Sequence, residues 1–296
     1  MKPIRRLVSP LTAMALALSA CGTGEQSGNG GPGRIAYQTT RYGALDIVAI
    51  DASGRNFKRL TTHLGDDGWP TWSPDTLHIA FQSDRAPTTR FQIYVMSSDG
   101  SNVTRLTYDT STDIMPAWSP DGSKIAFVSK RDGDGEIYVM DANGQNQQRL
   151  TTSPGEDGQP AWSPDGSKIA FVTDRDGNSE IYVMNAADGT GLVNLTNNPG
   201  TDWGPAWSRD GTKIAFYSNR ETDFAIWVMN SDGSNPVRLT DPAIQAGLPD
   251  WSADNTRIAY EQDGDLWVMN PDGSHKVRIT VGPAIVDGVP RWRPIL

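Results

Sequence analysis

Aspartate occupies one position of a segment that recurs six times along this chain. It stands three residues before a proline in DGWP, DIMP, DGQP, DWGP and DGVP, whereas the remaining copy, AGLP, has alanine. The residues are Asp67, Asp113, Asp157, Asp202 and Asp287, with Ala246 as the exception. Converging carboxylates repel one another unless a cation or a proton compensates, and carboxylate oxygens are typical Ca²⁺ ligands. The pattern predicts an acidic ring that binds Ca²⁺ or a basic partner. Alternatively, each aspartate accepts hydrogen bonds from its own loop or from the adjacent repeat.

Apolar side chains stand next to these carboxylates, at Trp69, Met115, Trp203, Leu248 and Val289. Aromatic and methionine side chains on loops are enriched at protein interfaces. Alternatively, they fill the centre of the fold or pack on neighbouring loops. We predict a partner-binding surface that contains Asp67, Trp69, Asp113, Met115, Asp157, Asp202, Trp203 and Asp287. The five aspartates among them are also the candidate metal ligands.

Arginine recurs two residues after a serine or threonine, at Arg85, Arg131, Arg175 and Arg220. We expect these arginines to form salt bridges within a loop or between repeats. The acidic run Asp132 to Glu136 superficially resembles a calcium loop. Because it lacks the EF-hand spacing, which needs glycine at the sixth place and glutamate at the twelfth, we interpret it as a hairpin turn.

Motifs for enzyme catalysis are weak. The sequence has no G-x-S-x-G elbow and no phosphate-binding glycine motif. His63, His78 and His275 stand at unlike places in the repeat, so a metal site of three histidines is not expected. Carboxylate pairs are abundant, which leaves acid/base glycosidase chemistry open.

The repeat that positions these residues is clearest in residues 116–151, PAWSPDGSKIAFVSKRDGDGEIYVMDANGQNQQRLT. Its tryptophan recurs every 41 to 46 residues, at Trp72, Trp118, Trp162, Trp207, Trp251 and Trp292. A period of this length with four short strand patterns predicts a β-propeller blade. The SPDG segment suits a type I turn, and the IAFVS and IYVM strands are apolar on both faces, as strands covered on both sides require.

The two ends of the repeat array complement each other. IAYQT, DIVAID and KRLT, between Ile35 and Thr61, match the second, third and fourth strands without a tryptophan strand before them. VPRWRPIL, from Val289 to Leu296, supplies a tryptophan strand with nothing after it. We therefore predict an all-β, six-bladed propeller over residues 34–296, closed in its last blade by the C-terminal strand. Closure removes the exposed edges that an open stack would have.

Residues 1–20 have a basic start, an apolar run and small residues, as in an export signal too short to span a membrane. The only cysteine, Cys21, excludes an intramolecular disulfide, and Leu18 to Cys21 resembles a bacterial lipobox. That resemblance implies cleavage before Cys21 and its acylation. The glycine-rich residues 21–33 predict a flexible tether. The formal charge of −9, without a basic stripe, argues against nucleic-acid binding.

The repeats resemble those of the TolB family of periplasmic β-propellers, over residues 34–296. The resemblance implies calcium in the central channel and partner binding at its mouth. TolB also has an N-terminal α/β domain, where this chain has the tether, so roles that depend on that domain are not expected. We predict a monomeric, exported, lipid-anchored protein on the periplasmic side or cell surface, with a non-catalytic role in binding or scaffolding an envelope protein. The alternatives are a carbohydrate-active or other hydrolytic propeller and a small-ligand sensor.

Overall fold

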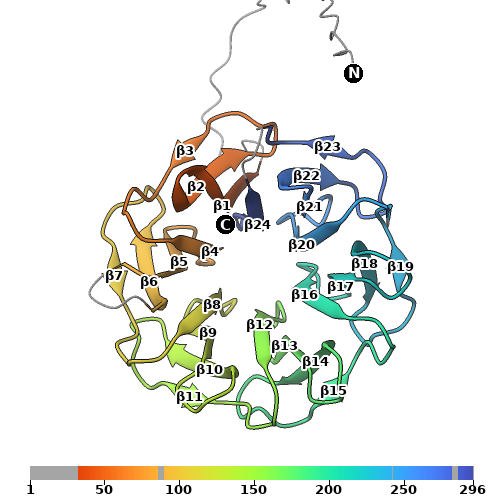
Figure 1. Ribbon diagram of the computed structural model, residues 1–296, viewed down its shortest axis with the longest axis horizontal. Coiled ribbons are helices and arrows are strands. Elements are labelled where there is room, and N and C mark those ends of the chain that lie inside the picture. Colours follow the sequence, from red (N-terminus) through yellow and green to blue (C-terminus); the bar gives the residue numbers. More distant parts are fainter. Residues whose placement is uncertain (1–32, 86–89, 242, 282–285, 296) are drawn as a thin grey trace, which may run out of the picture. The chain divides into compact units, whose positions relative to one another are not determined.

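The computed structural model describes residues 33–85, 90–241, 243–281 and 286–295, which all belong to one compact unit, Pro32–Leu296. They form six four-stranded antiparallel sheets arranged as blades around a central axis (Figure 1). The predicted six-bladed, all-β propeller is confirmed. The predicted signal peptide, Cys21 and nearly all of the predicted tether lie outside the described residues. None of the described residues belongs to a helix long and apolar enough to cross a membrane.

Each blade runs from an inner strand beside the axis to a short outer strand. Blade 1 contains β4 (Asp67–Trp72), β5 (His78–Ser83), β6 (Gln92–Ser97) and β7 (Thr104–Arg105). Blade 2 contains β8 (Asp113–Trp118), β9 (Lys124–Ser129), β10 (Glu136–Asp141) and β11 (Gln148–Arg149). Blade 3 contains β12 (Asp157–Trp162), β13 (Lys168–Thr173), β14 (Glu180–Asn185) and β15 (Val193–Asn194).

The remaining blades follow the same order, except that the last combines both ends of the chain. Blade 4 contains β16 (Asp202–Trp207), β17 (Lys213–Ser218), β18 (Ala225–Asn230) and β19 (Val237–Arg238). Blade 5 contains β20 (Ala246–Trp251), β21 (Ile258–Gln262), β22 (Asp265–Met269) and β23 (Val277–Arg278). Blade 6 contains β24 (Asp287–Trp292), β1 (Arg34–Tyr42), β2 (Ala44–Asp51) and β3 (Lys58–Arg59).

Blade 6 closes the ring in the predicted way. β24 pairs antiparallel with β1, with Ile35 opposite Trp292 and Thr39 opposite Asp287. The closing strand also reaches the first blade, because the indole N–H of Trp72 donates to the carbonyl of Arg291 at 3.2 Å. The same contact between neighbouring inner strands joins Trp162 to Ala117 and Trp207 to Ala161.

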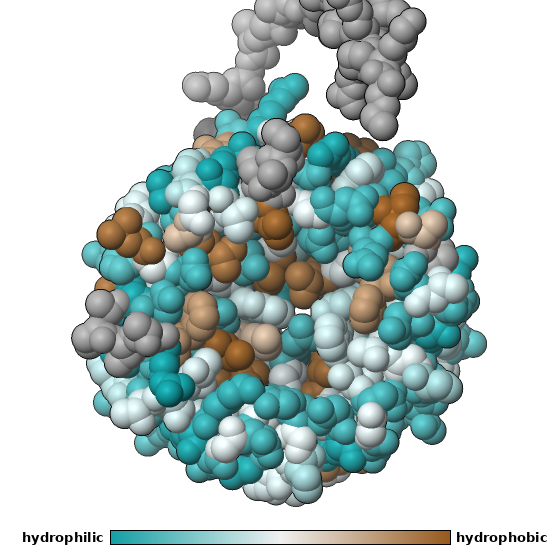
Figure 2. All heavy atoms as spheres, in the orientation of Figure 1, coloured by the Kyte–Doolittle hydropathy of each residue, from teal (hydrophilic) through white to brown (hydrophobic). Residues whose placement is uncertain are grey.

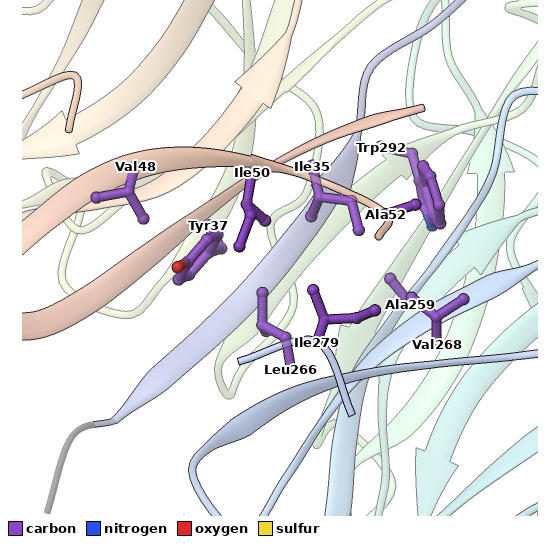
Figure 3. Packing of buried hydrophobic residues seen from close by; sticks show 10 residues of the cluster. All are labelled: Ile35, Tyr37, Val48, Ile50, Ala52, Ala259, Leu266, Val268, Ile279 and Trp292. Atoms are coloured by element: carbon purple, nitrogen blue, oxygen red, sulfur yellow. The ribbon is translucent and has the colours of Figure 1, made fainter. Parts of the chain in front are cut away.

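The core lies between adjacent blades. Figure 3 shows one such interface, where Ile35, Val48 and Ile50 of blade 6 face Leu266 and Val268 of blade 5. These side chains are at most 4% exposed. Complete burial of a side chain of this size is worth roughly 1.5–3 kcal/mol. Second and third strands that are apolar on both faces therefore stabilise the interface on each side of a blade.

The two ends of the ring differ in their loops. We call the end at which each inner strand begins the loop face; it carries the described parts of the connections into the inner strands and the hairpins between second and third strands. The opposite end, the turn face, carries the SPDG-type hairpins and the hairpins between third and fourth strands. On the turn face, the Asp121 carboxylate accepts hydrogen bonds from Ser119 and Ser123, as a tight polar turn requires.

Candidate binding face and central channel

The five repeated aspartates are the first residues of their inner strands and are buried, with at most 1% exposure. Four of them pair with an arginine that follows the second strand of the same blade. The N–O distances are 2.8 Å for Asp67–Arg85, 3.4 Å for Asp113–Arg131, 3.2 Å for Asp157–Arg175 and 2.9 Å for Asp202–Arg220. In blade 6, Arg41 lies 4.0 Å from Asp287. The four arginines form salt bridges as expected, but each bridge links two strand ends of one blade rather than lying within a loop or between repeats.

This geometry differs from a ring of ligands around one ion. None of the five aspartates is among the described residues that line the central channel. The part of the chain that the structure describes contains no group of three or more His, Cys, Asp or Glu side chains placed to hold a metal ion. Each of four carboxylates already has a guanidinium as its counter-charge. The residues present therefore do not fit the Ca²⁺ expected in the channel, because the aspartates face the blade interior.

Blade 2 adds a second carboxylate to the same arrangement. Arg131 lies 2.8 Å from Asp109 and 3.4 Å from Asp113, so one guanidinium serves two acids. Burial, followed by the neighbouring Asp109, raises the pKa of Asp113 to about 6. Burial also raises the pKa of Asp67, although Arg85 opposes that shift.

Blade 5 lacks both members of the pair. Ala246 replaces the aspartate and lies opposite Gln262, and the position of the arginine, two residues further on, is Gly264. Within this one chain, carboxylate and guanidinium are thus present together or absent together. This is the pattern expected if the aspartate is kept for its arginine rather than for an external ligand.

The channel is lined by the third and later residues of the inner strands and encloses about 260 Å³. The third residue adopts a left-handed backbone conformation in every blade, with φ of 51° at Trp69, 56° at Met115, 50° at Gln159, 64° at Gly204, 55° at Leu248 and 52° at Val289. Such values are unusual for residues other than glycine and mark local strain. Glutamine side chains stabilise this left-handed conformation. The backbone amide of Trp69 donates to the Gln38 side chain at 3.1 Å, and that of Met115 donates to the Gln82 side chain at 3.0 Å.

The predicted apolar residues consequently have three different environments. Trp69, Met115 and Leu248 line the channel, whereas Val289 is only 1% exposed. Trp203 is the second residue of its strand, one position earlier than Trp69 in blade 1, and is 36% exposed.

Trp203 belongs to an aromatic cluster on the loop face. Its ring stacks on Phe224 with the centroids 5.7 Å apart and meets Tyr217 edge-on at 5.9 Å. Tyr217 and Phe224 are themselves 5.5 Å apart. Three mutually packed rings form a rigid apolar surface, because each ring restricts the rotation of the other two.

Further apolar side chains are exposed on the loop face, and the repeat pattern did not single them out. They are Tyr42, Leu64, Tyr108, Ile244, Val281 and Val286, with exposures from 38% to 95%. The sequence feature that could have identified them is an apolar residue within an otherwise polar connection between strands. Figure 2 shows apolar side chains gathered around the central opening, with hydrophilic side chains covering most of the perimeter. An apolar centre with a polar rim is the usual anatomy of a protein interface.

The three histidines are exposed and lie apart in the repeat, as expected. His78 is 3.7 Å from Asp75 on the turn face, and Nδ1 of His275 lies 2.9 Å from Asn270. Neither of these two contacts involves a second histidine.

Comparison with known proteins identifies the family. The TolB beta propeller domain matches residues 27–115, 110–192 and 153–294. The chain belongs to the TolB β-propeller domain family. This TolB-family chain is similar to TolB from Acinetobacter baumannii, with 24% identity, a TM-score of 0.78, and coverage of 89% of this chain and 67% of the other. None of the curated proteins compared with it matches.

Two other solved structures show how widely this fold is used. An Agrobacterium tumefaciens protein assigned to TolB has 22% identity and a TM-score of 0.71, with coverage of 90% of this chain and 100% of the other. An oligogalacturonate lyase in complex with manganese has 14% identity and a TM-score of 0.59, with coverage of 83% and 73%. Because the last protein is an enzyme, likeness at this level establishes the TolB-type propeller fold and not an activity.

Proposed function

We propose that this TolB-family propeller is a non-catalytic binding protein of the bacterial cell envelope that docks a protein partner on its loop face. The observation that carries the proposal is Trp203, which is 36% exposed on that face and is held in place by the partly buried rings of Tyr217 and Phe224. Large aromatic side chains that stay exposed in the isolated protein are the typical anchors of protein interfaces. Tyr108, which is 72% exposed, extends the apolar surface over another blade.

A protein partner fits this surface better than a small molecule does. Small-molecule sites are concave and usually enclose roughly 300–1,000 Å³. The apolar residues of the loop face are spread over several blades, and the channel itself encloses about 260 Å³. A partner that covers several loops would bury them together.

The aspartates then have an indirect role in binding. As positioning residues, Asp67 and its equivalents hold the start of each inner strand against the end of the second strand. Asp67 accepts two hydrogen bonds from Arg85 at 2.8 Å, two residues before Trp69. In this proposal the partner contacts Trp69, Met115 and Trp203 directly. The carboxylates act by fixing the backbone that carries those side chains.

Substitution on the two faces tests the docking surface. The mature protein, immobilised, is exposed to an envelope extract of the host, and the partner is quantified by mass spectrometry. Trp203→Ser or Tyr108→Ser should lower its recovery about tenfold or more, as expected for interface anchors worth 2 kcal/mol or above. The matched control is Leu77→Ser, because Leu77 is 58% exposed but lies on the turn face. Equal recovery with all three variants would contradict the proposal.

We further propose export and anchoring through a lipid on Cys21. The support is the signal-like segment before it, the lipobox resemblance and the TolB family assignment. Intact-mass analysis should show a mature chain that begins at Cys21 and carries acyl groups, and Cys21→Ser should release the protein from membranes. A mature wild-type chain without lipid would refute the anchor and leave the binding face unaffected.

The hydrolytic alternative has no specific observation in its favour. The described histidines are separate, and the repeated carboxylates are buried beside arginines.

A further inference from the structure

The central channel has a charged sector on one side only. At the fifth position of the inner strand, blades 1 to 4 have the small residues Thr71, Ala117, Ala161 and Ala206. Blades 5 and 6 have Asp250 and Arg291 there. Arg209 adds a third charge, because it follows the inner strand of blade 4 where the first three blades have Pro74, Pro120 and Pro164. No other charged residue is found among the described residues that line the channel.

Two of these three charges neutralise each other. The Arg209 guanidinium lies 3.6 Å from Asp250 and also donates to the carbonyl of Trp251 at 3.1 Å. The same carboxylate accepts a hydrogen bond from the backbone N–H of Trp292 at 2.6 Å. Asp250 is only 8% exposed, and both contacts are made by its Oδ2 atom.

Arg291 remains without an equivalent partner. Within the described residues its guanidinium makes one hydrogen bond, from Nη1 to the carbonyl of Pro290 at 2.9 Å, and no carboxylate lies within 4.0 Å. Burial lowers the pKa of Arg291, and the more distant Asp250 partly opposes this. An arginine nevertheless stays protonated in proteins and has five N–H donors. Most of those donors are therefore available toward the channel.

We infer that the channel binds a carboxylate group at Arg291, within the sector that it forms with Arg209 and Asp250. A guanidinium presents parallel N–H donors that match the two oxygens of a carboxylate, and partial burial strengthens the attraction. The channel volume of about 260 Å³ accommodates a small organic acid or the terminal residue of a peptide. This site takes an anion, although the chain as a whole has a formal charge of −9.

The charged residues of this site are not among the proposed partner contacts, although two of those contacts, Trp69 and Met115, line the same channel. Arg209 lies beyond the end of β16, so the charged sector is displaced toward the turn face. Trp203, on the loop face, is absent from the described channel lining. Carboxylate binding and partner docking can consequently be tested independently.

Titration with simple carboxylates tests the inference on the full mature protein. The probes are sodium acetate, N-acetyl-Ala-Ala with a free carboxyl group, and the C-terminal amide of the same peptide, all at constant ionic strength. Tryptophan fluorescence reports binding, because Trp72, Trp118 and Trp292 line the channel. We expect saturable binding of at least one free carboxylate and none of the amide. Tighter binding of acetate would identify a small acid as the ligand, and tighter binding of the peptide would identify a chain terminus.

Arg291→Ala introduces the residue that three other blades already have and should weaken binding about tenfold or more, since it removes a charge-assisted hydrogen bond. Arg291→Lys, which keeps the charge, should restore part of the affinity. The matched control is Arg257→Ala, an exposed arginine outside the channel lining, and it should bind as the wild type does. Absence of saturation with every carboxylate, or unchanged binding in Arg291→Ala, would overturn the inference. Trp203→Ser should leave this titration unchanged, which separates it from the docking proposal.

Discussion

At the scale of single residues, the buried aspartates show how a carboxylate is tolerated in the wall of a propeller. Asp67 is 0% exposed and has Arg85 at 2.8 Å, and the guanidinium also lies over the rings of Phe81 and Tyr94. Removing one partner of such a pair leaves an uncompensated buried charge, which is more costly than removing both. The absence of both partners in blade 5 follows from the same energetics.

This predicts a non-additive pair of substitutions. Arg85→Met keeps an apolar stem over the two rings but isolates Asp67, and should lower the free energy of unfolding by about 3 kcal/mol. Combining it with Asp67→Ala should recover part of that loss, because the isolated carboxylate is then gone. Urea denaturation of the two single variants and the double variant measures the coupling. Losses that simply add would show that the two side chains act independently.

A pH effect follows from Asp113, whose pKa of about 6 in the folded protein exceeds the value near 3.9 of an unfolded chain. Between these values the folded state holds a proton that the unfolded state has released. Stability therefore falls as pH rises through this window, by at most about 1.4 kcal/mol per pH unit. Denaturation at several pH values should show wild type gaining stability relative to Asp113→Asn as pH falls from 7 to 4. A difference independent of pH would contradict the assignment.

At the scale of elements, the inner strand determines what the sequence could reveal. Trp72 and its copies predicted the strand, the repeat and the closure, because hydrophobic period and turn residues are local signals. The direction in which the Asp67 side chain points does not follow from such local signals. Its strand has a register shift between Gly68 and Thr71, and a bulge breaks the simple alternation of side chains between two faces. The sequence predicted an acidic ring of these aspartates, whereas Asp67 is buried inside the blade beside Arg85.

The same bulge explains why two tryptophans that look equivalent are not. In DGWP the tryptophan is the third residue and lines the channel, whereas in DWGP it is the second, and Gly204 takes the left-handed position. A Cβ on Gly204 would lie 2.6 Å from the Tyr217 ring. The one-residue offset was visible in the sequence, but its consequence required knowing which residue carries the positive φ.

Contacts between blades provide a prediction for the third-to-fourth hairpins. Gly144 has φ of 85°, and a Cβ there would lie 2.6 Å from the carbonyl oxygen of Leu106 in the preceding blade. Gly133, in the hairpin between β9 and β10, has φ of 115° and open space around it. Gly133→Ala should cost about 1–2 kcal/mol from backbone strain alone. Gly144→Ala should cost about 1–3 kcal/mol more, because the blades must separate.

Thermal or urea unfolding of the two glycine variants gives the comparison directly. Equal losses would mean that the hairpin tolerates the added methyl group and that the approach of the two blades is not a constraint.

At the scale of the whole molecule, ring closure depends on the last strand. β24 pairs with β1, Arg293 donates from its backbone N–H to the carbonyl of Arg34 at 2.7 Å, and its side chain reaches Thr76 in blade 1 at 2.9 Å. Residues at the two ends of the described propeller are thus joined in one blade. Cooperative unfolding should depend on this junction, since every blade contacts only the blades next to it.

Deleting residues 289–296 should therefore abolish cooperative unfolding rather than lower stability by a fixed amount. The deletion removes Trp292 from the core between blades 5 and 6 and leaves the edge of β1 unpaired, and an open edge of this kind promotes association between chains. Trp292→Ala is the matched control: it keeps the strand and should lower the free energy of unfolding by about 3–5 kcal/mol while the transition stays sharp. Calorimetry and light scattering distinguish the two results. A truncated chain that stays monomeric and melts in one sharp transition would show that five complete blades hold the ring without its closing strand.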